Sequence, residues 1–97
     1  MVRTEREVIN DLITRYSVKH GVSESVIHTV INCESGYRPR AVGDAGYSRG
    51  LVQIHSKYWP EITDEMAFDP EFAISFLAKK LSENRGKLWT CYRTNYR

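Results

Sequence analysis

The chain has 97 residues, which is enough for one domain built around a single core. Its 14 lysines and arginines are scattered among 12 acidic residues and leave a net charge of +2. This balance argues against nucleic acid as a partner, although a mildly basic protein still associates favourably with an anionic polymer. No apolar run approaches the length of a membrane-spanning segment, so we expect no membrane insertion.

The amino-terminal segment predicts a helix over residues 5–19. Thr4 and Glu7 have the spacing of a capping box at its start, and Gly21 follows its end. A single apolar stripe runs along the segment and consists of Val8, Ile9, Leu12, Ile13 and Tyr16.

A second helix is expected over residues 24–35 and a third over residues 70–85. Ser23 is placed to cap the second helix, and Gly36 is placed to end it. The dipeptide Asp69-Pro70 supplies a cap and a first-turn proline for the third helix.

The rest of the chain predicts a loop and short helical turns. Residues 36–50 hold four glycines and a proline, which is typical of a loop. Alternation of the kind found in strands is nearly absent, and short helical turns are expected at residues 51–55, 63–68 and 88–92. We therefore expect one small all-α domain over residues 1–97, wrapped around the second helix.

The chain has two cysteines, Cys33 and Cys91. They are too few for a four-cysteine zinc site, and His20 and His28 do not lie at the spacing of a known finger, so both histidines are interpreted as surface residues. A disulfide is favoured over two buried free thiols, and its closed loop would add about 2–4 kcal/mol of stability. A disulfide also indicates an oxidising compartment.

The apolar face of the second helix ends in a glutamate. Ile27, Val30 and Ile31 share that face, and Glu34 lies four and three residues beyond the last two. Partial burial and the negative end of the helix dipole should both raise the pKa of this carboxyl group. A carboxylic acid that stays protonated near neutral pH can donate a proton to a leaving group. Periodicity alone leaves open an ordinary surface glutamate at a fraying helix end.

The residues after this helix give a second signal. Segment 43–50 is polar and glycine-rich, and it returns into the apolar run GLVQI, as loops that form cleft walls do. The stretch ESGYRPRAVGDAGYSRGLVQIH resembles the SLT-like lytic transglycosylases and goose-type lysozymes, in particular small bacterial or phage members. The matching motifs are Glu34-Ser35 and Ser48-Arg49-Gly50-Leu51-Val52-Gln53-Ile54. The segments DPEF and LWTCYR are also similar, so the likeness covers roughly residues 15–93.

This resemblance implies a lysozyme-like fold and a role for each matched residue. Glu34 would be the catalytic acid and base, and Ser48 and Gln53 would line the cleft and bind sugar groups. Tyr92 is the candidate for the family's carboxy-terminal tyrosine, although the residues after it lack the usual asparagine and glycine. A disulfide between the two cysteines would bring Tyr92 to the helix end that carries Glu34, because bonded cysteines have neighbouring backbones.

Several further residues are candidates for the substrate cleft. Goose-type lysozymes have an aspartate in the loop matched by Asp44 and a second one where this chain has His55, so half of a hydrolytic pair is present. Without the resemblance, Asp44 is a turn residue favoured beside glycine and His55 a polar residue at the cleft rim. Tyr47 or Tyr58 is expected to stack on sugar rings, and Trp89 is expected in the core.

The resemblance implies an enzyme that cleaves the β-1,4 bond between N-acetylmuramic acid (MurNAc) and N-acetylglucosamine (GlcNAc) of peptidoglycan and leaves a 1,6-anhydro end. It would need neither a metal nor an organic cofactor, and its partners would be peptidoglycan glycan strands. We expect a monomer that is secreted, periplasmic or cell-wall associated, although the start MVRTEREV lacks the apolar core of a signal peptide. The alternatives are a lysozyme-type hydrolase using Glu34 and Asp44, a catalytically silent wall-binding module or scaffold, and an unrelated helical interaction domain.

Overall fold

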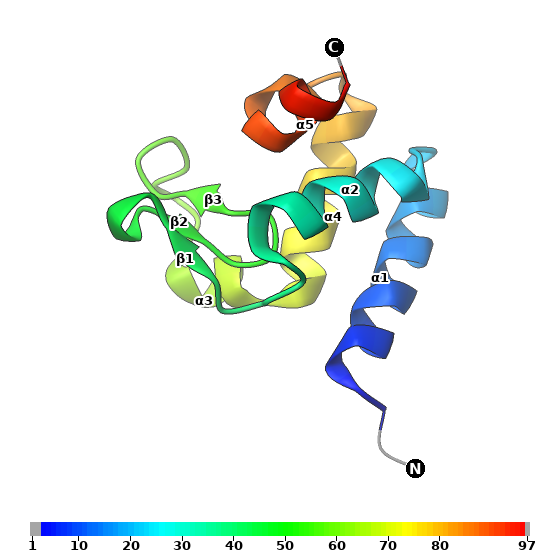
Figure 1. Cartoon of the computed structure of the whole chain (residues 1–97), viewed down its shortest axis with the longest axis horizontal. Coiled ribbons are helices and arrows are strands. Elements are labelled where there is room, and N and C mark those ends of the chain that lie inside the picture. Colours follow the sequence, from blue (N-terminus) through cyan, green and yellow to red (C-terminus); the bar gives the residue numbers. More distant parts are fainter. Residues whose placement is uncertain (1–2, 97) are drawn as a thin grey trace.

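The computed structural model describes residues 3–96, and helices carry most of them (Figure 1). The α-helices are α1 (Glu5–His20), α2 (Glu24–Ser35), α3 (Asp64–Phe68), α4 (Pro70–Ser82) and α5 (Thr90–Asn95). The described part also has two 3-10 turns, η1 (Asp44–Gly46) and η2 (Gly86–Leu88). Its three short strands are β1 (Val42–Gly43), β2 (Ser48–Arg49) and β3 (Ile54–His55). The expected all-α class is confirmed, with α2 and α4 crossing the middle of the molecule.

The helix boundaries follow the capping residues closely. The hydroxyl of Thr4 accepts from the Glu7 N–H at 3.1 Å, and the Glu7 carboxylate accepts from the Thr4 N–H at 3.2 Å, which confirms the capping box. Ser23 caps α2 through the N–H of Val26 at 3.2 Å. The helix α4 ends at Ser82 rather than at residue 85, because the chain leaves helical geometry and Asn84 is left-handed, with φ of 60°.

The segment between α2 and α3 forms a small antiparallel sheet with the order β1-β2-β3. The sequence analysis missed it because strands of two residues are too short to show alternation. The expected helical turn at residues 51–55 is wrong. Gly50 and Gln53 have φ of 85° and 54°, so this stretch reverses direction between β2 and β3 instead of coiling.

Gly50 allows the sheet to approach α3. A side-chain carbon at this position would lie 2.0 Å from the carbonyl oxygen of Ala67, so the close approach of the two backbones requires glycine. Next to it, the buried Arg49 guanidinium donates to the carbonyls of Ile54 at 3.2 Å and Ile62 at 3.0 Å, and to the Asp64 carboxylate at 2.9 Å. These bonds tie β2, β3 and α3 into one unit beside the end of α2.

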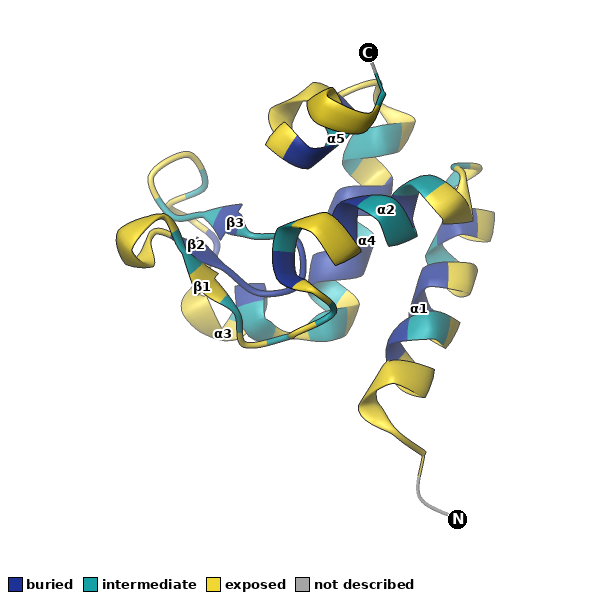
Figure 2. Cartoon of the chain, in the orientation of Figure 1, coloured by how far each residue is buried: buried dark blue, intermediate teal, exposed yellow. Residues whose placement is uncertain are grey.

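The core lies where α1, α2, α4 and the sheet meet (Figure 2). The apolar face of α2 is fully buried, as the sequence predicts, and α4 contributes a second buried face. Trp89 also belongs to the core, as expected, and its indole N–H donates to the Val52 carbonyl at 2.7 Å. No helix among residues 3–96 is long and apolar enough to cross a membrane. The largest fully buried side chains include Ile9, Ile13, Ile27, Ile31, Leu51, Ile54, Ile74 and Leu77.

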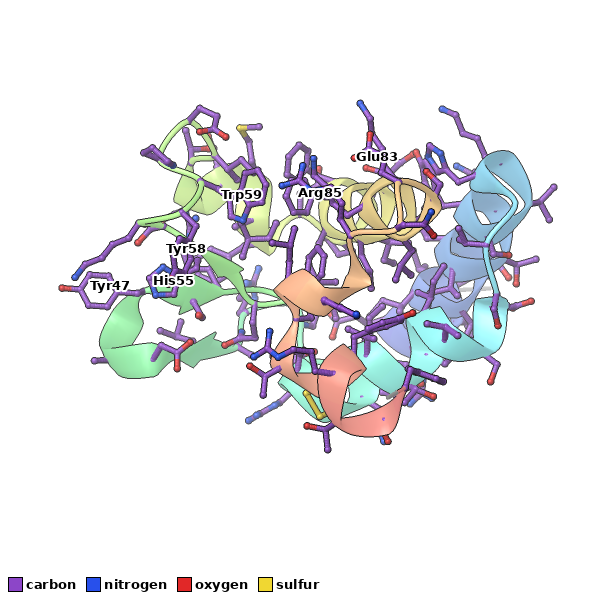
Figure 3. All side chains as sticks on the ribbon, turned by 90° about the horizontal axis from the view of Figure 1, so that it is seen from above. Tyr47, His55, Tyr58, Trp59, Glu83 and Arg85 are labelled. Carbon is purple, nitrogen blue, oxygen red and sulfur yellow. A yellow bond between two sulfur atoms is a disulfide. The ribbon has the colours of Figure 1, made fainter. Side chains whose placement is uncertain are left out.

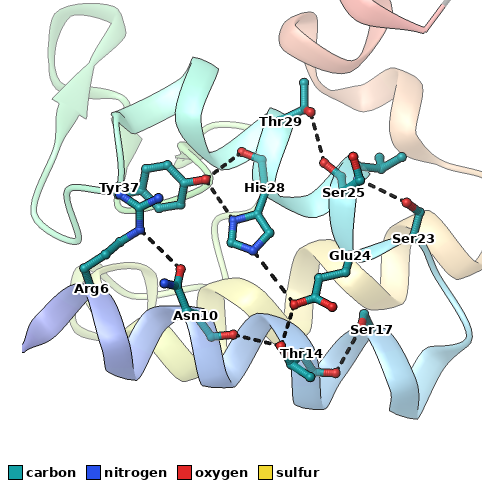
Figure 4. A network of polar contacts seen from close by, with 11 residues as sticks. Arg6, Asn10, Thr14, Ser17, Ser23, Glu24, Ser25, His28, Thr29 and Tyr37 are labelled. Carbon is teal, nitrogen blue, oxygen red and sulfur yellow. Dashed lines mark hydrogen bonds and ion pairs between the residues drawn. The ribbon is translucent and has the colours of Figure 1, made fainter. Parts of the chain in front are cut away.

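A polar network joins α1 to both ends of α2 (Figure 4). The Nδ1 atom of His28 lies 2.8 Å from the Tyr37 hydroxyl, and the Arg6 guanidinium carbon lies 3.4 Å from the centroid of the Tyr37 ring. His28, interpreted as a surface residue, is half-buried, with a side chain that is 30% exposed and bonded to Tyr37. The network holds Tyr37, which has φ of 63° directly after Gly36, against the exit of α2.

Candidate active site

Glu34 lies in the last turn of α2, one residue before the helix ends. The left-handed Gly36, with φ of 61°, closes the helix, and the buried Ser35 hydroxyl donates back to the Ile31 carbonyl at 3.1 Å. The Glu34 side chain is half-buried, and its Oε2 accepts a long hydrogen bond of 3.4 Å from the Cys91 N–H. The apolar stripe of α2 therefore ends in a carboxyl group that meets α5.

A disulfide joins Cys33 to Cys91 with a Cα–Cα distance of 5.9 Å. The bond predicted from the sequence is present, and the alternative of two free thiols is excluded. Because Cys33 precedes Glu34 directly, the bond holds α5 against the end of α2. It thereby places the Cys91 N–H at the carboxyl group.

The pKa of Glu34 is raised above its ordinary value. Burial is the largest cause, since it disfavours the charged carboxylate, and the negative charge of Asp44 acts in the same direction. The Cys91 N–H and the positive charge of Arg93 oppose the shift by favouring the carboxylate. The net shift of the Glu34 pKa is upward, which is the direction that the sequence analysis expected from burial.

Glu34 lines an open cleft of about 640 Å³ between the sheet and α5. Six of the residues expected in the site line this cleft together, namely Glu34, Asp44, Ser48, Gln53, His55 and Tyr58. The rest of the cleft lining consists of Ile54, Trp59, Arg85, Lys87, Leu88, Trp89, Thr90 and Arg93.

Ser48 and Asp44 form a pair on the sheet side of the cleft. The Ser48 side chain is buried, and its hydroxyl donates to Oδ2 of Asp44 at 2.5 Å. Asp44 itself is exposed at the start of η1, and it and Ala45 have φ of 51° and 57°. The Ser48 bond fixes one Asp44 oxygen, while the charge of Asp44 acts on Glu34.

Gln53 also belongs to the wall of the cleft that the sheet forms, and its side chain bonds to the backbone there. Its amide nitrogen donates to the carbonyls of Ala41 at 3.1 Å and Gly50 at 2.9 Å. A side-chain carbon on Gly43 would lie 2.6 Å from its amide oxygen, so β1 approaches closely there. Gln53 is thus bonded to the backbone of the hairpin, and it does not lie in the helical turn expected at residues 51–55.

Three rings lie together at the rim of the cleft, with Tyr47 stacked on His55 and Tyr58 tilted against it (Figure 3). His55 lies between Tyr47, at 5.6 Å between ring centroids, and Tyr58, at 4.7 Å. The Lys57 ammonium sits 4.2 Å from the Tyr47 centroid, so Tyr47 is contacted by both His55 and Lys57. Tyr58 is 77% exposed, against 41% for Tyr47, and it therefore offers the freer ring.

Tyr92 does not line the cleft, although its helix does. A side-chain carbon on Gly86 would lie 2.8 Å from the Tyr92 ring, and the Tyr96 ring lies 5.1 Å away between centroids. The disulfide brings α5 to Glu34 as expected, but the side chains that reach the cleft are those of Thr90 and Arg93.

The sequence analysis missed the contribution of residues 85–93 to the site. Arg85, Lys87 and Arg93 all line the cleft, and their crowding within RGKLWTCYR was the available signal. Their function could not be inferred because periodicity does not place a short irregular segment. Among residues 3–96, no group of three or more His, Cys, Asp or Glu side chains could hold a metal ion.

A half-buried carboxylic acid on the wall of an open polar cleft is an arrangement that glycosidases use to protonate a leaving oxygen. Residues 11–94 match the family model of the Transglycosylase SLT domain, and the chain belongs to this family. The match confirms the resemblance drawn from the Glu-Ser and Ser-x-Gly-Leu motifs. Domains of this family cleave glycosidic bonds of peptidoglycan, an extracytoplasmic polymer. No curated protein and no solved structure matches the chain.

Proposed function

We propose that the chain is a lytic transglycosylase that cleaves the β-1,4 bond from MurNAc to GlcNAc and closes a 1,6-anhydro ring on MurNAc. The observation that carries this proposal is Glu34: a carboxyl group with a raised pKa, half-buried on the cleft wall. A silent wall-binding module has no need for a protonated acid at this position, so the geometry favours an enzyme.

The first step needs an acid. Protonated Glu34 donates its proton to the glycosidic oxygen, the bond from that oxygen to C1 of MurNAc breaks, and GlcNAc leaves as an alcohol. The carbonyl oxygen of the substrate's own N-acetyl group stabilises the developing cation at C1. Such substrate assistance is a known exception to the scheme with two protein carboxylates.

The second step needs a base. Glu34, now ionised, accepts the proton of the MurNAc 6-hydroxyl while O6 bonds to C1 and the N-acetyl oxygen is released. The enzyme then has its proton back, and no water has been consumed. Because the attacking hydroxyl belongs to the substrate, a high effective molarity replaces the positioning of an external nucleophile.

The neighbouring residues have supporting roles in this proposal. Ser48 and Gln53 build the sheet wall, and the exposed face of Tyr58 stacks on a sugar ring. Asp44 acts through its charge, which helps to keep Glu34 protonated. Peptidoglycan as substrate, together with the disulfide, supports an extracytoplasmic place of action.

A lysozyme-type hydrolase is the second candidate, and the presence of Asp44 in the cleft favours it. A hydrolase must position a water, and Asp44 is the carboxylate that could do so. Its Oδ2, however, accepts from Ser48, and the Asp44 side chain is exposed rather than enclosed beside Glu34. These contacts support the electrostatic role over that of a base.

Mass spectrometry of the products tests the proposal. Purified protein is incubated with isolated peptidoglycan, and the released fragments are weighed. Anhydro ends are lighter than reducing ends by one water, so the two reactions are separated directly. Reducing ends as the main product would reject the transglycosylase and favour the hydrolase, and absence of any cleavage would favour a binding module.

A further inference from the structure

One wall of the cleft is cationic. Arg85 precedes η2, Lys87 lies within it, and Arg93 belongs to α5, and all three line the cleft and are exposed. Among residues 3–96, no carboxylate oxygen lies within 4.0 Å of a cationic nitrogen of these three side chains, whereas four ion pairs of lysine or arginine form elsewhere. The positive charge of this wall is therefore not neutralised by a close ion pair in the described part of the protein.

The two arginines are partly held in position before any ligand binds. Nη1 of Arg93 donates to the Lys87 carbonyl at 2.5 Å, and Nη2 donates to the Thr90 hydroxyl at 2.9 Å. The Arg85 guanidinium carbon lies 5.8 Å from the ring centroid of Trp59, and Figure 3 shows the two side chains next to each other. A guanidinium that is already oriented loses little freedom when it binds, and its fork of donors matches a carboxylate.

The cationic wall faces the acidic side of the same cleft. Glu34 and Asp44 lie on α2 and η1, and Arg93 is close enough to Glu34 for its charge to act on the carboxyl group. A glycan strand bound in the cleft would therefore lie between Glu34, which must reach the glycosidic oxygen, and the cationic wall. The cations of this wall could bind an anionic group of the strand.

We propose that Arg85, Lys87 and Arg93 form a carboxylate-binding subsite for the acidic groups that peptidoglycan carries on muramic acid. This inference rests on the proposed function, since it names the part of that substrate that meets this wall. Muramic acid bears a lactyl ether that ends in a free carboxylate or continues into a stem peptide with its own carboxylates. Chitin has GlcNAc units joined by the same β-1,4 bond and no carboxylate, so the wall would separate the two polymers by charge.

Binding of an anion here would also act on the catalytic acid. The positive charge of Arg93 lowers the pKa of Glu34, and a carboxylate bound to the wall would offset that charge. The carboxyl group would then hold its proton more firmly when an anionic substrate is bound. A neutral strand would leave the positive charge of Arg93 unbalanced, and the pKa of Glu34 would then stay lower. Anionic and neutral strands would therefore differ both in affinity and in how readily Glu34 donates its proton.

The test measures affinity without turnover. In a Glu34→Gln background, calorimetry compares the binding of soluble peptidoglycan strands with stem peptides, the same strands stripped by an amidase, and chitin oligomers. Arg85→Gln and Lys87→Gln are then introduced together, since both side chains are exposed and their loss leaves the core intact. Lys19→Gln with Lys79→Gln removes the same charge from exposed positions on α1 and α4 and serves as the matched control.

The cationic-wall variant should bind carboxylate-bearing strands about fivefold more weakly, and binding of chitin oligomers should be unchanged. A loss confined to stem-bearing strands identifies the stem carboxylates as the ligand, and a loss that persists after amidase treatment identifies the lactyl carboxylate. Unchanged affinity for every strand, or an equal loss on chitin or in the control variant, would overturn the subsite. Lysis of cell walls by the Glu34→Gln protein would instead reject the proposed function. The measured affinities of the cationic wall for the strands would still stand in that case.

Discussion

The backbone N–H of Cys91 points at Oε2 of Glu34 across 3.4 Å, and it joins residues that are 57 positions apart in the chain. The contact exists because the neighbouring Cys33 is bonded to Cys91. A donor fixed in this way favours the ionised carboxylate, whereas burial favours the acid, and burial is the larger effect. A group that acts first as an acid and then as a base requires both influences.

Replacing Glu34 with Gln should abolish cleavage of peptidoglycan while the fold persists. The amide keeps the shape of the side chain but cannot deliver a proton, and loss of a general acid costs a factor of about 10²–10⁴ or more. Turbidity of cell-wall suspensions measures the rate, and circular dichroism checks the fold. If the folded variant clears cell-wall suspensions at the parental rate, Glu34 is not the catalytic acid.

The same substitution should change how stability depends on pH. Because its pKa is raised in the folded state, Glu34 binds its proton more tightly there than in the unfolded chain. In the interval between the two pKa values, the folded state therefore holds more protons, and stability falls as pH rises. The Glu34→Gln variant lacks this loss, so its melting temperature relative to the parent should increase as the pH rises above the ordinary glutamate pKa of about 4.3. A constant difference across this range would contradict the raised pKa.

Asp44→Asn should keep a substantial fraction of the activity and should still yield anhydro ends. Removing the Asp44 charge lowers the pKa of Glu34, so the basic limb of the pH–rate profile should shift to lower pH. Asparagine retains an oxygen that can accept from Ser48, so the sheet wall should hold its shape. An equal loss of activity in Asp44→Asn and Glu34→Gln, with reducing-end products, would instead identify Asp44 as a hydrolytic base.

Tyr58→Ala should raise KM for glycan strands more than Tyr47→Ala does. The Tyr58 ring is the more exposed one, whereas the Tyr47 ring is contacted by His55 and Lys57. Loss of one aromatic stacking contact of about 1 kcal/mol corresponds to roughly a fivefold change in KM. Steady-state kinetics on soluble strands compare the two variants, and a larger effect in Tyr47→Ala would reverse their roles.

Removing the disulfide by Cys33→Ser with Cys91→Ser should lower the free energy of unfolding by about 2–4 kcal/mol. Activity should fall as well, because α5 carries the Cys91 N–H and two cleft-lining side chains. Denaturant unfolding measures the first effect. A thiol reductant should reproduce both effects in the parent and have none in the serine variant, and a parent insensitive to the reductant would show that α5 stays docked without the bond.

Much of the fold could be predicted because its signals are local. The capping box of Thr4 and Glu7, the Ser23 cap and the Asp69-Pro70 start each act within one turn of helix, and the structure has all three. Glu34 could be singled out for the same reason, since its place on the apolar stripe follows from helical spacing alone. Its position relative to the rest of the cleft followed from the family resemblance.

The remaining features depend on contacts distant in sequence or on irregular backbone. Gln53 was expected within a helical turn, but its left-handed backbone and its bond to Ala41 place it inside a hairpin. The contribution of Arg85 and Lys87 depends on how η2 docks beside Trp89, which no periodicity encodes. Tyr92 was matched by family position, and the packing of its ring on Gly86 depends on a close approach that sequence spacing does not reveal.

The disulfide also gives the cleft an order of assembly. Residues separated by 58 positions must meet before the wall that carries Arg93 stands opposite Glu34. During synthesis α2 leaves the ribosome before α5, and a reducing cytosol keeps the two thiols unbonded. Under the proposed function, a newly made chain would therefore carry Glu34 in a cleft whose α5 wall is not yet covalently fixed, and oxidation outside the cytosol would fix it.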